Sequence, residues 1–396
     1  MPVDVLVLPS YYPYPGRERA GSFFRDQAEA LARAGACVGV AFVEPRSLRD
    51  LSWRALSESH WQTISQREEG VWTVRQKGWN IGLRTVSGSR VWASLLVRLV
   101  LRKLTGPLRP DVIHAHNALY AGLAARAIAK QLGIPYIVTE HSAALLMGTA
   151  SPAAIGLARK VYADAHAVVA VSAALARAIT PYAGGNPVRV IPNVVDADFF
   201  APPPAPRGQS RFKVLAVGDL SPNKGFDVLI RAFAAQFRGA PEYELVIGGE
   251  GPAQSKLKAL ARECGIAGQA TFPGELTRQQ VREAMWSAHV LVISSYYETF
   301  GVVAIEAIAT GMPVIATRCG GPEDVITPEI GWLVSPGDSR EMAAALRQAQ
   351  ENRKDLSQNR DRLIEPYSMP SVAGKLITLY ERAGSGKTTS IGSICA

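Results

Sequence analysis

Short, continuously apolar runs, each ended by a turn, alternate along the chain with longer segments rich in alanine and leucine. The longer segments, such as 22–35 and 119–133, have helical periodicity. In the first half the short runs predict strands over 3–9, 37–43, 111–116, 135–141, 167–172 and 188–193. Because apolar strands that are each followed by a helix are typical of a covered parallel sheet, the first half predicts an α/β domain.

The same alternation begins again after residues 201–209, APPPAPRGQ, where prolines interrupt any regular element, so we expect an interdomain linker there. Strands are predicted over 212–220, 243–251, 270–274, 290–295, 313–317 and 331–334. Two domains also suit a chain of 396 residues. Open α/β sheets bind ligands at the carboxyl ends of their strands, so the gap between the domains is the expected ligand site.

One residue departs from this pattern, because Glu306 interrupts the otherwise apolar helical run 302–309. Such a run predicts a helix without a polar face, and a buried carboxylate needs a partner. That partner is either a ligand carrying hydroxyl groups or a buried arginine such as Arg318. Glu298 stands just before the helix, whose start favours an anion. A diphosphate flanked by hydroxyl-rich rings would suit both carboxylates; the alternative for Glu298 is a purely structural helix-start carboxylate.

Two glycine-rich turns follow other strands of the second half. Lys224 lies in a turn after strand 213–218, where its ammonium can reach a phosphate, although a solvated loop lysine is the alternative. Gly249 belongs to the second turn, VIGGEGP at 246–252. The motif G-x-G-x-x-G follows none of the predicted strands, which argues against a dinucleotide-dependent oxidoreductase.

Polar side chains gather at strand ends in the first half. His114 and His116 are two apart on one strand, so both project to the same side near its carboxyl end. With Asn117 and His141 they indicate polar contact with a ligand. Zinc is an alternative, but the sequence offers no evident carboxylate to complete a ligand set, and no metal is predicted.

Two turn regions carry separate expectations. The connection 9–22 is long for a strand-to-helix loop, and long loops are often functional. In it Gly21 allows close backbone approach, and Ser22 has the alternative role of helix N-cap. Asp196 and Asp198 are interpreted as a turn rather than a metal site.

The amino-acid composition indicates which partners the protein binds and in which compartment it is located. A net charge of +9 and a pI near 9.4 suit acidic partners such as nucleic acid, anionic lipid or phosphorylated small molecules. Residues 89–110 are apolar with basic ends, which fits a helix on an anionic membrane surface or a buried helix of the first domain. The chain has no run long enough to span a membrane. No signal peptide is evident, and the spacing of Cys37, Cys264, Cys319 and Cys395 is not that of metal ligands, so a reducing cytoplasm is expected.

The C-terminal region is helical in pattern over 341–383 and ends in a segment, 384–396, that we expect to be a flexible tail. Its GSGKTT is not interpreted as a phosphate-binding loop, because Glu381 stands where the first glycine belongs and no strand precedes it.

Taken together and in this order, these segments resemble the retaining glycosyltransferases of family 4. The similarity runs over nearly the whole chain, and its most specific element is the E-x7-E pair Glu298 and Glu306. The resemblance implies the GT-B fold, two Rossmann-like parallel-sheet domains facing each other across a central cleft. It implies an acceptor-side domain at 1–200, a nucleotide-sugar domain at 210–369, and a helix at 370–383 that crosses back to the first domain.

The resemblance also implies roles for individual residues. Glu306 would bind the donor's ribose and Lys224 its phosphates, with Gly21 and Gly249 on glycine-rich loops at the donor. The backbone of Thr299, Phe300 and Gly301 would contact sugar hydroxyls and the diphosphate. His116 and Glu298 would act at the transferred sugar, and His114, Asn117 and His141 are further candidates nearby. The sequence departs from the family at Asp219, where an arginine is common. Either Arg318 or Arg25 would then supply the second cation, or Asp219 turns away from the diphosphate.

The implied function is retaining, metal-independent and cofactor-free transfer of a sugar from a nucleotide diphosphate sugar, UDP favoured over GDP. The acceptor would be a saccharide or a lipid-linked molecule, in surface polysaccharide or glycolipid synthesis. Nucleic acid is not an expected partner, whereas an anionic membrane surface is a candidate partner of residues 89–104. The expected location is the cytoplasm, with peripheral attachment to the inner face of the membrane as an alternative. The alternatives are a sugar-nucleotide epimerase of this fold or a non-catalytic glycan- or membrane-binding relative.

Overall fold

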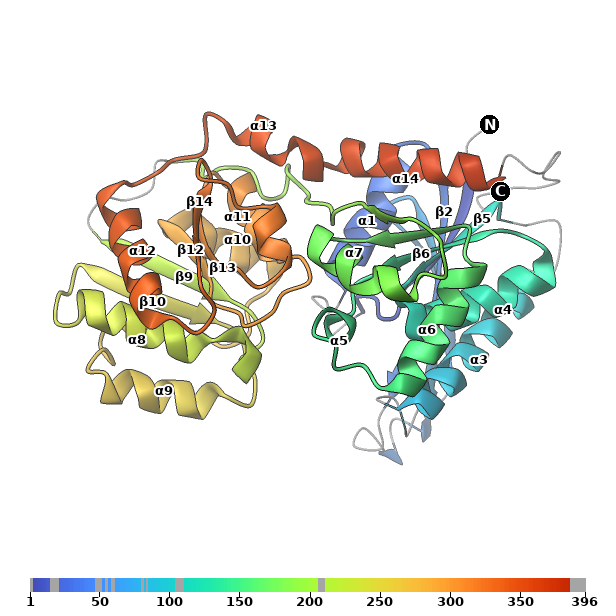
Figure 1. The fold of residues 1–396 in the computed structure, drawn as a ribbon, viewed down its shortest axis with the longest axis horizontal. Helices are drawn as coiled ribbons and strands as arrows, with labels where there is room; N and C mark the ends of the chain where they lie inside the picture. Colours follow the sequence, from blue (N-terminus) through green and yellow to red (C-terminus); the bar gives the residue numbers. More distant parts are fainter. Residues whose placement is uncertain are drawn as a thin grey trace. The chain divides into compact units, whose positions relative to one another are not determined.

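The computed structural model describes residues 3–14, 21–46, 52–53, 56–57, 61–79, 82, 85–103, 110–205 and 211–384. They form two compact units, one running up to Val194 and resuming at Met369, the other Val195–Ser368 (Figure 1). The division lies at Val194 rather than at 201–209, because residues beyond it are fastened to the second unit. Arg360 donates to Ala197 O, and Trp286 Nε1 donates to Ala201 O over 2.8 Å.

The first unit contains an eight-stranded sheet in the order β3-β4-β2-β1-β5-β6-β7-β8. All pairs are parallel except the antiparallel β3–β4. The strands are β1 (Asp4–Leu8), β2 (Cys37–Arg46), β3 (Thr63–Glu68), β4 (Val71–Trp79), β5 (Val112–His116), β6 (Tyr136–Glu140), β7 (Ala167–Ala170) and β8 (Val188–Val190). The six predicted strands are confirmed, and the hairpin of β3 and β4 was not foreseen.

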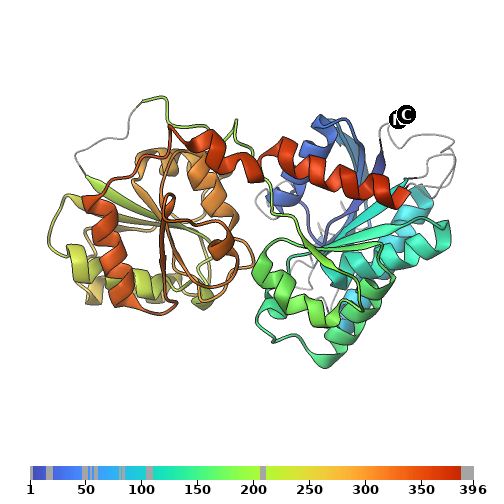
Figure 2. The ribbon, with the colours of Figure 1, turned by 45° about the horizontal axis from the view of Figure 1, so that its top comes forward.

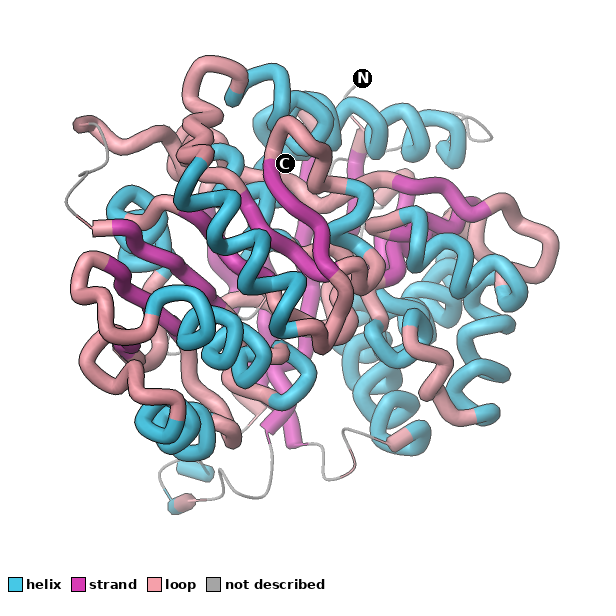
Figure 3. The backbone as a smooth tube through the Cα atoms, turned by 60° about the vertical axis from the view of Figure 1, so that its left-hand side comes forward, coloured by secondary structure: helices cyan, strands magenta, loops and turns pink. Residues whose placement is uncertain are grey.

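Helices flank this sheet (Figures 1 and 3). They are α1 (Ser22–Arg33), α3 (Val86–Lys103), the π-helical η2 (Asn117–Gly122), α4 (Leu123–Leu132), α5 (Ala143–Leu146), α6 (Pro152–Asp164), α7 (Ala173–Ile179), the short η3 (Thr180–Tyr182) and α14 (Met369–Gly384). Several begin with a serine side chain that accepts a backbone N–H, as Ser151 does for α6 and Ser172 for α7.

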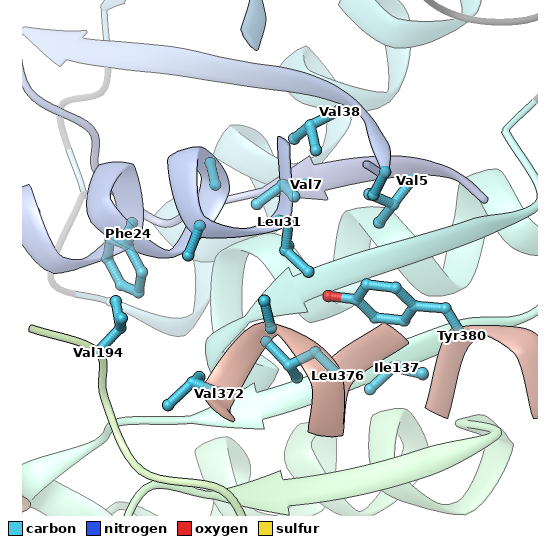
Figure 4. Packing of buried hydrophobic residues seen from close by; sticks show 14 of the residues in the cluster. Val5, Val7, Phe24, Leu31, Val38, Ile137, Val194, Val372, Leu376 and Tyr380 are labelled. Atoms are coloured by element: carbon cyan, nitrogen blue, oxygen red, sulfur yellow. The ribbon is translucent and has the colours of Figure 1, made fainter. Parts of the chain in front are cut away.

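The last helix, α14, belongs to the first unit although it comes from the far end of the chain. It packs beside α1 (Figure 2) and contributes Val372, Leu376 and Tyr380 to the core that the strands share with α1 (Figure 4). All three side chains are completely buried. The fold of the first unit therefore depends on residues that are synthesised after the whole second unit.

Helix α3 overlaps the segment 89–110, for which the sequence allows two interpretations. Its apolar face, which includes Leu96, is buried, and Trp92 Nε1 donates to Val43 O over 2.9 Å. Its basic residues Arg98, Arg102 and Lys103 are exposed. The packing supports the interpretation as a helix of the first domain. None of the described helices is both long and apolar enough to cross a membrane.

The second unit contains a six-stranded, all-parallel sheet in the order β11-β10-β9-β12-β13-β14. Its strands, all predicted, are β9 (Phe212–Val217), β10 (Tyr243–Gly248), β11 (Ala270–Thr271), β12 (Val290–Ile293), β13 (Val314–Thr317) and β14 (Gly331–Val334). Its helices are η4 (Pro222–Lys224), α8 (Phe226–Phe237), α9 (Gln254–Glu263), α10 (Arg278–Ser287), α11 (Val302–Ala309), η5 (Gly321–Asp324), α12 (Ser339–Glu351), α13 (Arg360–Ile364) and η6 (Glu365–Tyr367).

Three smaller expectations can be compared with the structure. Asp196 Oδ1 accepts the N–H of Phe199 over 3.0 Å, so this segment is the turn that was predicted. Cys264 and Cys319 are free thiols, whereas Cys37 is disulfide-bonded, which the expectation of a reducing compartment did not foresee. The tail, apart from Gly384, and part of the loop 9–22 lie outside the described residues.

Candidate active site

A cluster of three histidines lies at the carboxyl edge of the first unit's sheet. His114 and His116 lie on β5, with His116 at its end, and His141 follows β6, the neighbouring parallel strand. The Nδ1 of His116 and the Nε2 of His141 are 3.1 Å apart. Phe24 of α1 closes the cluster, with its ring centroid 4.6 Å from that of His116. The structure thus brings together the histidines that the sequence singled out.

The Nε2 atom of His116 is buried and has no hydrogen-bond partner among the described residues. Burial, with smaller contributions from His114 and His141, holds the pKa of His116 well below its usual value. The ring is therefore neutral near neutral pH. A buried polar atom without a partner costs free energy, so this nitrogen is a candidate for binding a ligand atom.

Asn117 and Glu140 hold the segment that follows His116 and the segment that contains His141. Asn117 has φ +73°, its side chain donates to Ser10 Oγ over 3.2 Å, and its Oδ1 accepts the N–H of His141. Glu140 is buried and accepts the N–H groups of Ala118, His141 and Ser142 and the hydroxyl of Tyr162. Burial nevertheless raises the pKa of the Glu140 carboxyl. The sequence reasoning missed Glu140, although its place directly before His141 at a strand end was a usable signal.

Gly21 stands where the long first loop enters α1. Its φ is +79°, and an added Cβ would lie 2.8 Å from Tyr11 O, so only glycine fits. Its carbonyl accepts the N–H of Phe24 over 3.0 Å, which makes Gly21 the N-cap and Ser22 the first helical residue. The alternative N-cap role for Ser22 is therefore wrong. Arg25, proposed as a second cation, approaches the carboxylate of Glu29 at 3.5 Å.

In the second unit, Lys224 and Glu298 form an ion pair. Lys224 Nζ lies 2.6 Å from Glu298 Oε2, and the two side chains are 26% and 20% exposed. The Lys224 turn is pressed against the end of β12, since Ser294 Oγ donates to Lys224 O over 2.7 Å. An added Cβ on Gly225 would lie 2.1 Å from Ser294 O. These contacts bring together two residues that lie far apart in the sequence and were both expected at the donor.

The segment before α11 is held by its backbone. Glu298 N donates to Cys319 O, and Gly321 N donates to Glu298 O over 2.7 Å. Gly301, with φ +86°, is the N-cap of α11, and Phe300 is buried. Thr299, between Glu298 and Phe300, is partly buried. The predicted turn and helix start are confirmed.

Glu306 differs from its expected surroundings. Val302, Val303 and Glu306 are only partly buried, whereas the other five residues of α11 are buried. Because residues three and four apart share one side of a helix, these three form a partly open face. The prediction of a helix without such a face is wrong. Glu306 is accessible to a ligand, and it does interact within the protein.

The remaining candidate residues, Gly249, Asp219 and Arg318, differ in how exposed they are to solvent. Gly249 has φ +142°, and an added Cβ would lie 1.8 Å from Gly218 O, so this turn requires glycine. Asp219 is exposed. Arg318 is not the buried arginine proposed for Glu306, because its side chain is 50% exposed and contacts Glu341 Oε1 at 3.2 Å. In the described part of the chain no group of three or more His, Cys, Asp or Glu residues could hold a metal ion.

Comparison with known proteins matches two successive parts of the chain to models of glycosyltransferase families. Residues 20–199 match the model of the family described as Glycosyltransferase Family 4, and residues 201–365 match Glycosyl transferases group 1. A glycogen synthase of Mycobacterium tuberculosis is 31% identical over 296 residues, which cover 70% of this chain and 70% of that protein.

Two further proteins extend the comparison. One subunit of the phosphatidylinositol N-acetylglucosaminyltransferase of Arabidopsis thaliana is 26% identical over 297 residues, 73% of this chain and 64% of its own length. This chain thus spans less than two thirds of that relative. The structure of HepE from Anabaena in complex with UDP and glucose has a TM-score of 0.72 at 19% identity, covering 96% of this chain and 100% of HepE. The chain therefore belongs to the family 4 glycosyltransferases, and its two parallel-sheet units are the domains of a GT-B fold.

Proposed function

We propose that this protein transfers a sugar from a nucleotide diphosphate sugar to a saccharide or lipid-linked acceptor. The observation that carries the proposal is the buried Nε2 of His116, which has no partner among the described residues and lies at the ligand-binding edge of a parallel sheet. Support for UDP as the nucleotide comes from HepE, which binds UDP and glucose. The two relatives, a glycogen synthase and a phosphatidylinositol glycosyltransferase, support saccharide and lipid acceptors respectively.

In the proposed reaction each residue has a role suited to its chemistry. Lys224 supplies positive charge to the diphosphate, and Glu298 and Glu306 accept hydrogen bonds from hydroxyls of the sugar and the ribose. His116, neutral because it is buried, hydrogen-bonds the transferred sugar through Nε2. The departing phosphate oxygen takes the acceptor's proton on the same face, so the anomeric configuration is retained. No metal or cofactor is required in this proposal, and the product enters surface polysaccharide or glycolipid synthesis.

A donor screen tests the proposal. Purified protein is incubated with UDP-, GDP- and ADP-sugars, with and without EDTA, and nucleotide release and the anomeric configuration of the product are followed by NMR. We expect release from a UDP-sugar that survives EDTA, and a product with the donor's configuration. Glu306→Gln should lower kcat/KM by about 10-fold or more, as expected for a lost charged hydrogen bond.

Glu351→Gln is the matched control, because Glu351 is an exposed glutamate on another helix of the same unit. Failure of every donor to bind or react, with Glu306→Gln indistinguishable from wild type, would favour the non-catalytic alternative. Epimerisation of the donor sugar without transfer would favour the epimerase.

A further inference from the structure

The C-terminal helix contributes a polar group to the histidine cluster. Tyr380 of α14 is completely buried, and its hydroxyl oxygen lies 2.7 Å from His114 Nδ1. Figure 4 shows this side chain among the core residues that α14 shares with the sheet. On the other side of the ring, His114 Nε2 lies 2.7 Å from Thr139 Oγ1 on β6. Both nitrogens of His114 are thus engaged, in a chain that links three elements.

This chain can specify where the single ring proton of His114 resides. Burial lowers the pKa of His114 to about 3 and raises that of the Tyr380 phenol, so both groups are neutral near neutral pH. A neutral imidazole has one donor and one acceptor nitrogen. If the phenol donates to Nδ1, the proton must lie on Nε2, from which it is donated to Thr139.

His114 in turn contacts the residue proposed to meet the sugar. The ring centroids of His114 and His116 are 4.4 Å apart, on the same side of β5. His116 has one hydrogen bond from its ring, through Nδ1 to His141, and its Nε2 has none among the described residues. A single bond allows the ring to pivot, so the direction of Nε2 depends on the rings of His114 and Phe24 packed against it.

We propose that Tyr380 is a positioning residue, whose hydroxyl fixes the tautomer and orientation of His114, which in turn holds His116 toward the reacting sugar. The expected effect of Tyr380 on catalysis rests on the proposed function. The hydrogen-bond chain from Tyr380 through His114 to Thr139 is independent of that function.

The test compares Tyr380→Phe with Tyr136→Phe in the full-length protein. Tyr136 is the matched control, because it also loses a buried hydroxyl, 2.6 Å from Val161 O, at the opposite end of β6 from Thr139. The tautomer of His114 is read from two-bond ¹H–¹⁵N spectra of protein labelled with ¹⁵N-histidine. Donor hydrolysis is measured in parallel as kcat and KM.

We expect wild type and Tyr136→Phe to carry the His114 proton on Nε2, and Tyr380→Phe to lose this preference. We also expect Tyr380→Phe to lower kcat about three- to tenfold with little change in KM, less than the ~100-fold that a 1 Å misplacement can cost. Thr139→Val supplies an independent arm that remains if Tyr380→Phe does not fold. It removes the acceptor at Nε2, so the proton should move to Nδ1 and be donated to Tyr380.

The outcomes separate the two proposals. The role of Tyr380 is overturned if the His114 tautomer is unchanged in both Tyr380→Phe and Thr139→Val. It is also overturned if Tyr136→Phe lowers kcat as much as Tyr380→Phe does. If the tautomer shifts as expected but the protein turns over no donor, the hydrogen-bond chain is supported and the proposed catalytic function is overturned.

Discussion

At the scale of single residues, Lys224 and Glu298 form an ion pair in which both side chains remain accessible to a ligand. Their side chains are partly exposed, so the ion pair contributes no more than about 1 kcal/mol to folding. The ion pair could not be read from the sequence alone, and for Glu140 the sequence signal was its place directly before His141 at the end of β6. The partners Lys224 and Glu298 are 74 residues apart. In the structure Glu140 accepts hydrogen bonds from four donors, which come from three separate segments of the chain.

Lys224→Met should weaken donor binding. Loss of a charged contact to the diphosphate is expected to raise the Kd for UDP about 10- to 100-fold, measured by titration calorimetry. The control is Lys213→Met, because Lys213 pairs with Glu244 at 3.6 Å with similar exposure, 25% and 24%, in the same unit. Equal effects of the two substitutions on the Kd would contradict a direct phosphate contact by Lys224.

Asp219→Arg should strengthen donor binding. It places a cation at the position where family members commonly have arginine, on an exposed turn that can accept a longer side chain. We expect the Kd for UDP to fall about two- to fivefold, as for an exposed charge pair. Asp219→Asn is the control, because it removes the repulsion between the carboxylate and the diphosphate without adding a positively charged contact. An unchanged or weaker affinity in the arginine variant would show that Asp219 points away from the phosphates.

At the scale of elements, the apolar strands of both sheets were predictable because buried parallel strands are apolar throughout. The hairpin of β3 and β4 was not, since β3 reads TISQRE, is mostly exposed and pairs only with β4 at the sheet edge. Helix α3 shows the limit of periodicity, because its apolar run fits burial and membrane contact equally well. In the structure α3 packs against β2 and α4, so one of its faces is buried.

The exposed face of α3 still allows a test of membrane contact. Neutralising Arg98, Arg102 and Lys103 to glutamine should abolish co-sedimentation with anionic vesicles, because basic residues near such a surface contribute about 1 kcal/mol each. The fold should persist, since all three lie outside the apolar face of α3. Neutral phosphatidylcholine vesicles are the control. Pelleting that is unchanged by the substitutions would rule out this helix as the contact.

At the scale of the whole molecule, the three histidines of the cluster, of which His114 and His116 are buried and His141 partly buried, should make stability depend on pH. The pKa values of His114 and His141 are lowered to about 3, and that of His116 lies well below 6.5, so the folded state resists protonation. Their contribution is complete above the unfolded pKa near 6.5 and is lost as pH falls toward 3. Each histidine contributes a slope of about 1.4 kcal/mol per pH unit.

Glu140 and Glu29 act in the opposite direction, because their raised pKa values favour the protonated folded state as pH falls. We therefore expect the free energy of unfolding in urea, followed by tryptophan fluorescence, to be level from pH 8 to 7 and to decline from pH 6 to 5. A constant or rising free energy of unfolding between pH 7 and 5 would contradict the lowered pKa values of the three histidines in the folded state.

The return of α14 to the first unit has a consequence for how the protein is made. The ribosome makes β1 well before α14, so the core around Leu31 and Val7 lacks Val372, Leu376 and Tyr380 until the segment after the second unit has been made. The second unit, Val195–Ser368, is complete before that point. Whereas most chains fold their first domain first, here the later unit can fold while the earlier one waits. A nascent chain stalled before Met369 would therefore expose an unfinished core, a surface for chaperones to recognise.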